Sequence, residues 1–463
     1  MFLSTLGVTE RQIRTELKKR QRDGQIAMEG RGGRREAEKV EDEEKRQSIL
    51  DHINKFPRKE SHYCRTNTKN EFLAPELNLT TMYNMYVSEM AANKKKPASR
   101  SLYNNIFKSL GLKFFALKKD ACGICLRKMK ENPTDESFLT MYQKHVDEKV
   151  KVRQVKEEAK KMASENPKIC AAVFDLQQVI YTPKSHHSSI FYKRRLANYN
   201  FTIFDLQSQE GRCFLWHEGI ARRGANEIST CIYKFLQEKD LDGTEEVILF
   251  CEGCVGQNKN SVLPSMILYS LEHAKNLKKV TVNYFETNHG QNEGGCMHSV
   301  IERKVSKQPE IMVPSQLATL IQTARATGKK QYTVYEINTV DVIDWKRYGQ
   351  DIGLHAWRDA LDGSSLVWTK VKSVALEKRK GECDMLFKHS HMEEFSVVSK
   401  PPKRQKHKHK SKTLPRPQNA YASVPKLSLP KYNDLIALCS RPKPVVYQQD
   451  QIMFYSNLPH TQK

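Results

Sequence analysis

Two acidic residues end apolar segments in the middle of this 463-residue chain. Asp175 and Glu252 each close a short run of apolar residues that is typical of a buried strand. Two further acids belong to a later region: Glu293 lies just before a segment with helical periodicity, and Glu302 lies on it. Mg²⁺ and Mn²⁺ prefer carboxylate oxygens as ligands. If these acids meet at one edge of a sheet, they could hold such cations and activate water for phosphodiester cleavage.

Apolar periodicity predicts the elements that must position these acids. The predicted strands are 169–175, 196–206, 212–217, 247–251 and 279–285. The predicted helices are 224–239, 258–274 with a break near Pro264, and 294–304. The order β-β-β-α-β-α-β-α is that of the ribonuclease H-like fold, in which three carboxylates meet at one edge of the sheet. We therefore predict an α/β protein with a ribonuclease H-like core, preceded by an all-helical region and followed by a disordered basic tail.

A second constellation has the ligand types of a zinc site. Cys122 and Cys125 form a Cys-x-x-Cys pair, and His145 follows on a long predicted helix. Zinc binds thiolate and imidazole ligands in a tetrahedron, so this set lacks one ligand. Cys64 and His62 are candidates for the fourth position. The alternative is a pair of ordinary reduced thiols, since a single Cys-x-x-Cys is weaker evidence than two.

The net charge of +24 points to a polyanionic partner, most simply DNA. The excess is divided between the two ends, with +11 over residues 1–167 and +11 over residues 400–463, so the middle is nearly neutral. No apolar run of about 18 residues is present, which argues against a membrane protein. The 11 cysteines are irregularly spaced, which argues against a secreted disulfide framework.

Basic residues that could contact phosphates lie in three places: a predicted hairpin, a Gly-Gln-Asn-Lys-Asn segment before a helix, and a short helix resembling half of a helix-turn-helix. They are Lys193, Arg194 and Arg195, then Lys259, then Arg11 and Arg14. Each of these also fits an ordinary solvated surface. The run of residues 400–412 is typical of a nuclear-import signal or a nucleic-acid arm. We see no small-molecule substrate in these patterns, and the oligomeric state stays open.

The predicted organisation has five parts, of which the fourth is either a continuation of the core or an appended unit. They are helix-turn-helix-like helices with a charged linker (1–60), a helical region with the zinc candidate (61–167), the ribonuclease H-like core (168–305), a mixed α/β extension (306–399) and the basic tail (400–463).

Several segments carry a resemblance to one uncharacterised, transposon-associated domain-of-unknown-function family that is abundant in insects and other animals. They are FDLQQV (174–179), FYKRRLANYNFTIFD (191–205), ARRGANEI (221–228), GQNKN (256–260), HGQNEGGCMHSVIE (289–302) and, upstream, HINKFPRKESHYCR (52–65) and the KKDACGIC segment. The resemblance spans roughly residues 1–390. It implies a transposase-like ribonuclease H-like core with Asp175, Glu252 and either Glu302 or Glu293 as ligands of Mg²⁺ or Mn²⁺.

Two departures from that family bear on activity. The family usually has Asp-Asn-Cys where this chain has Glu252-Gly253-Cys254, and it tends to have an acid where this chain has Gly295. A longer acid shifts a bound metal by on the order of 1 Å, which can cost about 10²-fold in rate. We therefore expect a transposon-derived nuclear DNA-binding protein whose core is either active or degenerate. The alternative is a non-catalytic DNA- or chromatin-binding protein on the same scaffold.

Overall fold

The computed structural model describes most of the chain and divides it into two compact units, residues 1–118 and 119–463. The described residues are 9–18, 36–56, 72–73, 77–114, 122–187, 189–190, 193–286, 289–290, 293–325, 330–379, 382–399, 415–440 and 444–462. Each unit is considered separately below.

The first unit is mainly helical, as the sequence predicts. Its elements are α2 (Glu10–Lys18), α3 (Glu36–Asn54), β1 (Phe72–Leu73), α4 (Leu79–Ala92), α5 (Arg100–Ser109) and β2 (Lys113–Phe114). Its core includes Ile53, Met82 and Tyr103. Ser99 caps the start of α5, because its hydroxyl accepts a hydrogen bond of 3.2 Å from the Leu102 amide.

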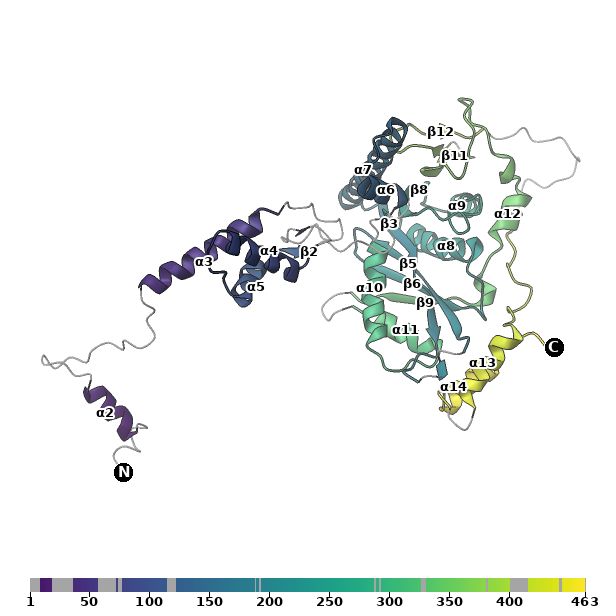
Figure 1. Ribbon diagram of the computed structural model, residues 1–463. Coiled ribbons are helices and arrows are strands. Elements are labelled where there is room, and N and C mark those ends of the chain that lie inside the picture. The colour runs from purple at the N-terminus through teal and green to yellow at the C-terminus, as the bar shows by residue number, and fades with distance from the viewer. Residues whose placement is uncertain are drawn as a thin grey trace, which may run out of the picture. The chain divides into compact units, whose positions relative to one another are not determined.

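The second unit contains one mixed ten-stranded sheet (Figure 1). Its strands are β3 (Ile169–Leu176), β4 (Ile180–Thr182), β5 (Leu196–Asp205), β6 (Gly211–His217), β7 (Glu246–Glu252), β8 (Lys279–Phe285), β9 (Thr333–Glu336), β10 (Ser373–Arg379), β11 (Glu382–Lys388) and β12 (Ser396–Val397). The spatial order is β12-β11-β10-β8-β7-β3-β5-β6-β9, and β4 pairs with β5. Strands β3, β7 and β8 are parallel, whereas β5 is antiparallel to both β3 and β6.

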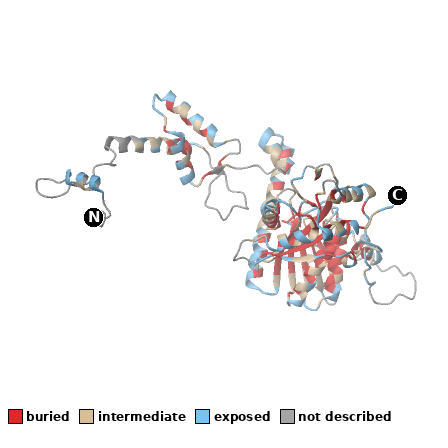
Figure 2. Cartoon of the chain, turned by 90° about the horizontal axis from the view of Figure 1, so that it is seen from below, coloured by how far each residue is buried: buried red, intermediate tan, exposed pale blue. Residues whose placement is uncertain are grey.

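Helices cover both faces of the sheet, which explains why its central strands are apolar on both sides. They are α6 (Gly123–Glu131), α7 (Glu136–Glu165), α8 (Ala225–Leu241), α9 (Val262–His273), α10 (Glu293–Ser306), α11 (Pro314–Gln322) and α12 (Trp345–Asp351). Helices α8, α9 and α12 share one core cluster with one set of alternating strand residues, while α7, α10 and α11 pack on the other set. Buried residues are therefore concentrated in the sheet and its flanking helices (Figure 2).

Five predicted strands and the helices between them are confirmed with small shifts at their ends. Pro264 lies in the first turn of α9, where a missing N–H costs nothing, so it does not break the helix. Residues 306–399 continue the core rather than forming an appended unit. They add β10 to β8 on one side of the sheet and β9 to β6 on the other.

The prediction of a disordered tail is wrong for its described part. Residues 400–414, which include the basic run, lie outside the described residues. The rest forms α13 (Leu429–Cys439) and α14 (Gln449–Ser456), which bury Leu435 and Tyr455 against Met312 and Val313. The prolines misled the prediction: Pro430 lies in the first turn of α13, where proline favours the start of a helix instead of preventing one.

Candidate functional site

Asp175 and Glu252 lie side by side at the ends of two neighbouring parallel strands. Val173 of β3 pairs with Phe250 of β7, and the same register places Asp175 beside Glu252 two residues later. Side chains alternate along a strand, so both carboxylates point to the face on which α7 and α10 pack. Neighbouring strands are only about 4.8 Å apart, so the two acids form one site.

The electrostatic surroundings of Asp175 are unfavourable to its charge. Burial and the neighbouring Glu252 carboxylate raise the pKa of Asp175 to about 7, and the amide of Leu176 opposes them by donating a hydrogen bond of 2.8 Å. Its side chain is 36% exposed. Among the described residues, no lysine or arginine forms an ion pair with Asp175. The site thus places two carboxylates side by side, and the repulsion between them is part of what raises the pKa of Asp175.

His298 of α10 approaches Asp175 through its ring nitrogen Nδ1. The Thr202 hydroxyl donates to the backbone oxygen of Asp175 at 3.2 Å. It also shares a hydrogen bond of 2.8 Å with Nε2 of His298, in which either group can be the donor, depending on the tautomer of the ring. The other nitrogen, Nδ1, lies 3.8 Å from Oδ2 of Asp175. Burial lowers the pKa of His298 to about 4, so the ring is neutral and could serve as a metal ligand.

Three polar residues that the sequence did not single out hold this arrangement. Gln177 accepts a hydrogen bond of 2.8 Å from the Asn200 amide and donates one of 3.4 Å to the backbone oxygen of His298. With Thr202, these residues connect β5 and the segment after β3 to α10. All three are almost fully buried. The signal in the sequence was the presence of polar residues inside the apolar FDLQQ and YNF segments. Polar side chains that are buried with such segments are normally hydrogen-bonded, so these residues could have been predicted to form a network.

The two predicted third carboxylates do not join Asp175 through any described contact. Glu302 is exposed on α10, and it forms no described hydrogen bond or ion pair. Glu293 begins α10 and accepts two hydrogen bonds, of 2.8 and 2.6 Å, from Lys156 of α7. Lys156 is only 1% exposed. Glu293 therefore has a visible structural partner, while His298 is the residue of α10 that reaches Asp175.

A short segment between β8 and α10 packs on Glu252. A Cβ added to Gly290 would lie 2.4 Å from Oε1 and 2.8 Å from Cγ of Glu252. Real Cβ atoms do not come so close, so only glycine fits at this position without a shift. The residue before it, His289, belongs to a second candidate site.

That second site gathers two thiols and two imidazoles. The ligand atoms of Cys122, Cys125, His145 and His289 all lie within 4.8 Å of one another. Both sulfurs are 3.5 Å from Nε2 of His145, and the Cys125 sulfur is 3.3 Å from Nε2 of His289. The predicted trio is thus brought together, with His289 as a fourth member that the sequence did not suggest. Cys64, the predicted fourth ligand, lies outside the described residues.

The basic residues singled out from the sequence have diverse surroundings. Lys193 and Arg194 lie just before β5 and both pair with Asp434 of α13. Arg195 stacks over the Tyr181 ring, with 5.4 Å to its centroid. Lys259 donates a hydrogen bond of 3.1 Å to the backbone oxygen of Thr369.

The remaining two basic candidates lie on α2 of the first unit. Arg14 pairs with Glu10 one turn away, and Arg11 is exposed. The short helix predicted there is confirmed, but nothing bears on a helix-turn-helix.

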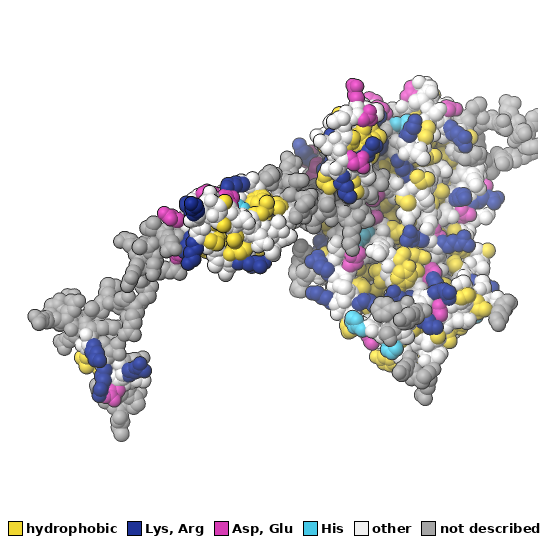
Figure 3. Space-filling view, in the orientation of Figure 1, with side chains coloured by type: hydrophobic (Ala, Val, Ile, Leu, Met, Phe, Trp, Pro, Cys, Tyr) yellow, Lys and Arg dark blue, Asp and Glu magenta, His cyan; other side chains and the backbone are white. Residues whose placement is uncertain are grey.

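A groove beside α10 gathers cations that the sequence analysis did not mark. It has a volume of about 560 Å³ and includes Arg303, Lys304, Lys307 and Arg325 in its lining. On the face shown in Figure 3, lysine and arginine side chains of the second unit are scattered among acidic and apolar ones. In the groove, by contrast, four cationic side chains share one concave surface.

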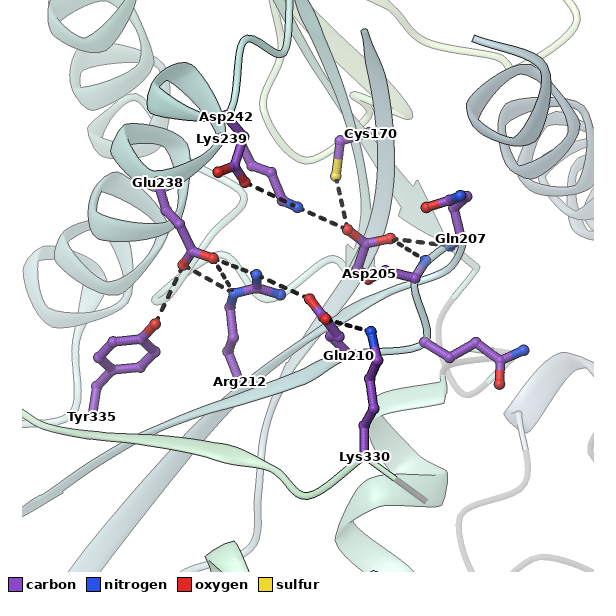
Figure 4. Close-up of polar contacts among 12 residues, drawn as sticks. Cys170, Asp205, Gln207, Glu210, Arg212, Glu238, Lys239, Asp242, Lys330 and Tyr335 are labelled. Atoms are coloured by element: carbon purple, nitrogen blue, oxygen red, sulfur yellow. Dashed lines mark hydrogen bonds and ion pairs between the residues drawn. The ribbon is translucent and has the colours of Figure 1, made fainter. Parts of the chain in front are cut away.

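A buried ionic network lies toward the start of β3, away from Asp175 (Figure 4). Asp205 pairs with Lys239 of α8 at 3.0 Å and accepts two backbone hydrogen bonds of 3.0 Å. Burial raises the pKa of Asp205, but Lys239 and these amides outweigh it, so the pKa lies below its ordinary value. Nearby, Arg212 pairs with Glu238, which also accepts from Tyr335. Every carboxylate here has a cationic partner, as expected of a structural network.

Comparisons with known proteins add no identity. The chain matches no protein-family model, and no curated protein matches it. Within the described residues, no helix has the length and apolar character needed to cross a bilayer.

Proposed function

We propose that the second unit is a ribonuclease H-like, transposase-type core that cleaves nucleic-acid phosphodiesters with Mg²⁺ or Mn²⁺. The observation that carries this proposal is the pair Asp175 and Glu252 at the ends of adjacent parallel strands. The strand order adds support. Numbered along the chain, β3, β5, β6, β7 and β8 are strands one to five, and they lie in the spatial order 5-4-1-2-3. That order, with β5 alone reversed, is the one expected of a ribonuclease H-like sheet.

His298 is the third member of the proposed site, in preference to Glu302 and Glu293. Its Nδ1 lies 3.8 Å from Oδ2 of Asp175. Burial keeps this imidazole neutral, and a neutral ring with its proton on Nε2 would offer Nδ1 as a ligand beside the two carboxylates, which remain the preferred ligands of Mn²⁺. Thr202 would hold that tautomer by donating to the backbone oxygen of Asp175 and accepting the proton of Nε2.

The protein's own residues prepare the site for this chemistry. Asp175 and Glu252 present oxygen ligands on one face, and Gly290 leaves room for the Glu252 side chain. Bound divalent ions activate the attacking water and stabilise the leaving oxygen. The cationic groove beside α10 could hold the phosphate backbone of the substrate, which the charge of +24 also favours. The family resemblance makes DNA the preferred substrate, and the basic run 400–412 suggests a nuclear protein.

Cleavage of supercoiled DNA in Mn²⁺ tests the proposal. We expect the wild-type protein to nick the DNA, and Asp175→Asn and Glu252→Gln to lose on the order of 10²-fold or more in rate. Asp351→Asn, an exposed residue of α12, is the matched control and should keep full activity. Absence of cleavage by the wild-type protein with any divalent ion would reject the nuclease.

A second pair of variants tests the third member of the site. We expect His298→Gln to lose cleavage and Glu302→Gln to retain it. The reverse result would return the third position to Glu302. The groove is tested by changing Arg303, Lys304 and Lys307 to alanine, which should reduce the salt dependence of DNA binding by about one slope unit per lost phosphate contact. Alanine at Lys144, Lys160 and Lys161 of α7 is the charge-matched control.

The alternative function is DNA or chromatin binding without cleavage. One observation favours it: among the described residues, three or more potential metal ligands come together in the Cys/His cluster but not around Asp175. Glu252 in place of the family's aspartate also favours a degenerate site. DNA binding that is steeply salt-dependent, unchanged in Asp175→Asn and never accompanied by nicking would support this alternative.

A further inference from the structure

Four potential metal ligands converge from three separate parts of the second unit. Cys122 precedes α6 and Cys125 lies in its first turn. His145 lies in the first half of α7, and His289 lies in the segment between β8 and α10. Cys122 and His145 are buried, while Cys125 and His289 are half-buried. Convergence of two thiols and two imidazoles across 167 residues of sequence is not a product of local chain geometry.

The distances within the cluster fit a tetrahedral ion. With zinc–sulfur bonds of about 2.3 Å and zinc–nitrogen bonds of about 2.05 Å, tetrahedral geometry requires sulfur–nitrogen separations of about 3.5 Å. Three of the four sulfur–nitrogen separations are 3.5, 3.5 and 3.3 Å, and the fourth is within 4.8 Å. Both cysteines are free thiols. Thiolate and imidazole ligands in a tetrahedron favour zinc over Mg²⁺ or Mn²⁺.

The residues behind the cluster orient it as they would around a metal. His145 directs Nε2 at both sulfurs, and its other nitrogen, Nδ1, lies 3.3 Å from Oε2 of Glu286. Glu286 in turn pairs with Lys372 of the strand-flanking segment before β10. A carboxylate behind a ligating histidine fixes its tautomer and strengthens its lone pair, which is the usual support for a histidine bound to zinc.

We propose that Cys122, Cys125, His145 and His289 bind one structural zinc ion. Four protein ligands leave no open position, so this ion does not activate water. It joins α6 and α7 to the His289–Gly290 segment, whose glycine packs directly on Glu252. Zinc therefore holds one wall of the acidic site, and the zinc assignment itself does not depend on the proposed nuclease function.

Metal analysis of the purified full chain tests the site. We expect about one equivalent of zinc in the wild-type protein and less than about 0.1 in Cys122→Ser/Cys125→Ser. The matched control is Cys254→Ser/Cys296→Ser, which changes two exposed cysteines outside the cluster and should retain zinc. Full zinc content in the Cys122/Cys125 variant, or none in wild-type protein grown with zinc, would overturn the proposal.

Cobalt substitution of the wild-type protein tests the geometry even if the cysteine variant fails to fold. We expect the visible bands of tetrahedral Co²⁺ together with a thiolate-to-cobalt charge-transfer band, both removed by added zinc. The pink spectrum of octahedral Co²⁺, without the thiolate band, would overturn the assignment.

The fourth ligand and its support have separate tests. His289→Gln should release zinc to a chelator much faster than wild type, whereas Cys64→Ser should match wild type; the opposite pattern would restore Cys64 as the ligand. Glu286→Gln should weaken zinc binding about 10- to 100-fold. An unchanged affinity in Glu286→Gln would contradict the role assigned to that carboxylate. None of these readouts requires DNA cleavage, so the zinc site can stand or fall separately from the nuclease.

Discussion

Two carboxylate clusters at different ends of the same strands are built on opposite principles. Asp205 lies in low-dielectric surroundings with Lys239 and two backbone amides directed at it. Asp175 lies beside the Glu252 carboxylate, and Nδ1 of the neutral His298 ring is 3.8 Å from it. The first arrangement lowers the pKa of its carboxyl group and the second raises it. Stability accounts for the first, whereas the second costs stability and calls for a cation or a function.

The largest effect is expected from breaking the balanced cluster. Asp205→Asn leaves the Lys239 ammonium, whose side chain is 10% exposed, without its main partner. We expect a loss of about 3–5 kcal/mol in the free energy of unfolding, measured by urea denaturation. Asp242→Asn is the control, because that partner of Lys239 is 57% exposed and should change stability by less than about 0.5 kcal/mol. Equal effects of the two variants would contradict the assigned role.

A steric change at the acidic cluster ranks second. Gly290→Ala places a methyl group against Glu252, whose side chain or backbone segment must move. We expect a loss of about 1–3 kcal/mol in stability, as for other overpacked sites, together with reduced divalent-ion binding. Gly256→Ala is the control, since an added Cβ there would meet nothing within 4 Å. Wild-type Mn²⁺ binding by Gly290→Ala, measured by calorimetry, would show that the packing on Glu252 is not critical.

Removing a charge from the acidic cluster should increase stability instead of decreasing it. Asp175→Asn relieves the repulsion from Glu252 and should raise stability in chelator at pH 8. The gain should be about 0.5–1 kcal/mol, because a third of the side chain meets solvent, which screens the repulsion. Addition of Mn²⁺ should stabilise the wild-type protein and leave the variant unchanged. Destabilisation by Asp175→Asn, as large as that from Asp205→Asn, would erase the distinction between the clusters.

The smallest expected effect is a difference between the two clusters in how stability depends on pH. The pKa of Asp205 is lowered on folding, so its contribution is present above about pH 4 and is lost as the pH falls further. The pKa of Asp175 is raised to about 7, so its contribution is present below about pH 4 and is lost as the pH rises through 7. Thermal unfolding in chelator should show that Asp205→Asn weakens the loss of stability below about pH 4, and that Asp175→Asn weakens the loss of stability between about pH 4 and 7. If neither variant changed the dependence of stability on pH, the pKa shifts assigned to Asp205 and Asp175 would be contradicted.

The sequence predicted the sheet better than it predicted the sites. Apolar runs locate β3, β5, β6, β7 and β8 because these strands are covered on both faces. The exact register of β3 and β7 is visible only in the tertiary structure. The sequence nevertheless predicted that Asp175 and Glu252 meet, because each acid ends an apolar run. The C-terminal helices were missed because their prolines resemble those of a disordered tail, while Leu435 and Tyr455 are buried only through contacts with distant residues.

The sequence predicted which types of ligand each candidate site contains, but not the full set of residues in each site. Residue type and spacing singled out Asp175, Glu252, Cys122, Cys125 and His145, since local chemistry restricts which side chains can hold a metal. Tertiary structure added His298 to the acids and His289 to the thiols. Both come from one segment that is far away in the chain, and long-range packing of that segment against β3 and α7 leaves no local pattern. The sequence thus determined the kind of chemistry, and the fold decided which residues share it.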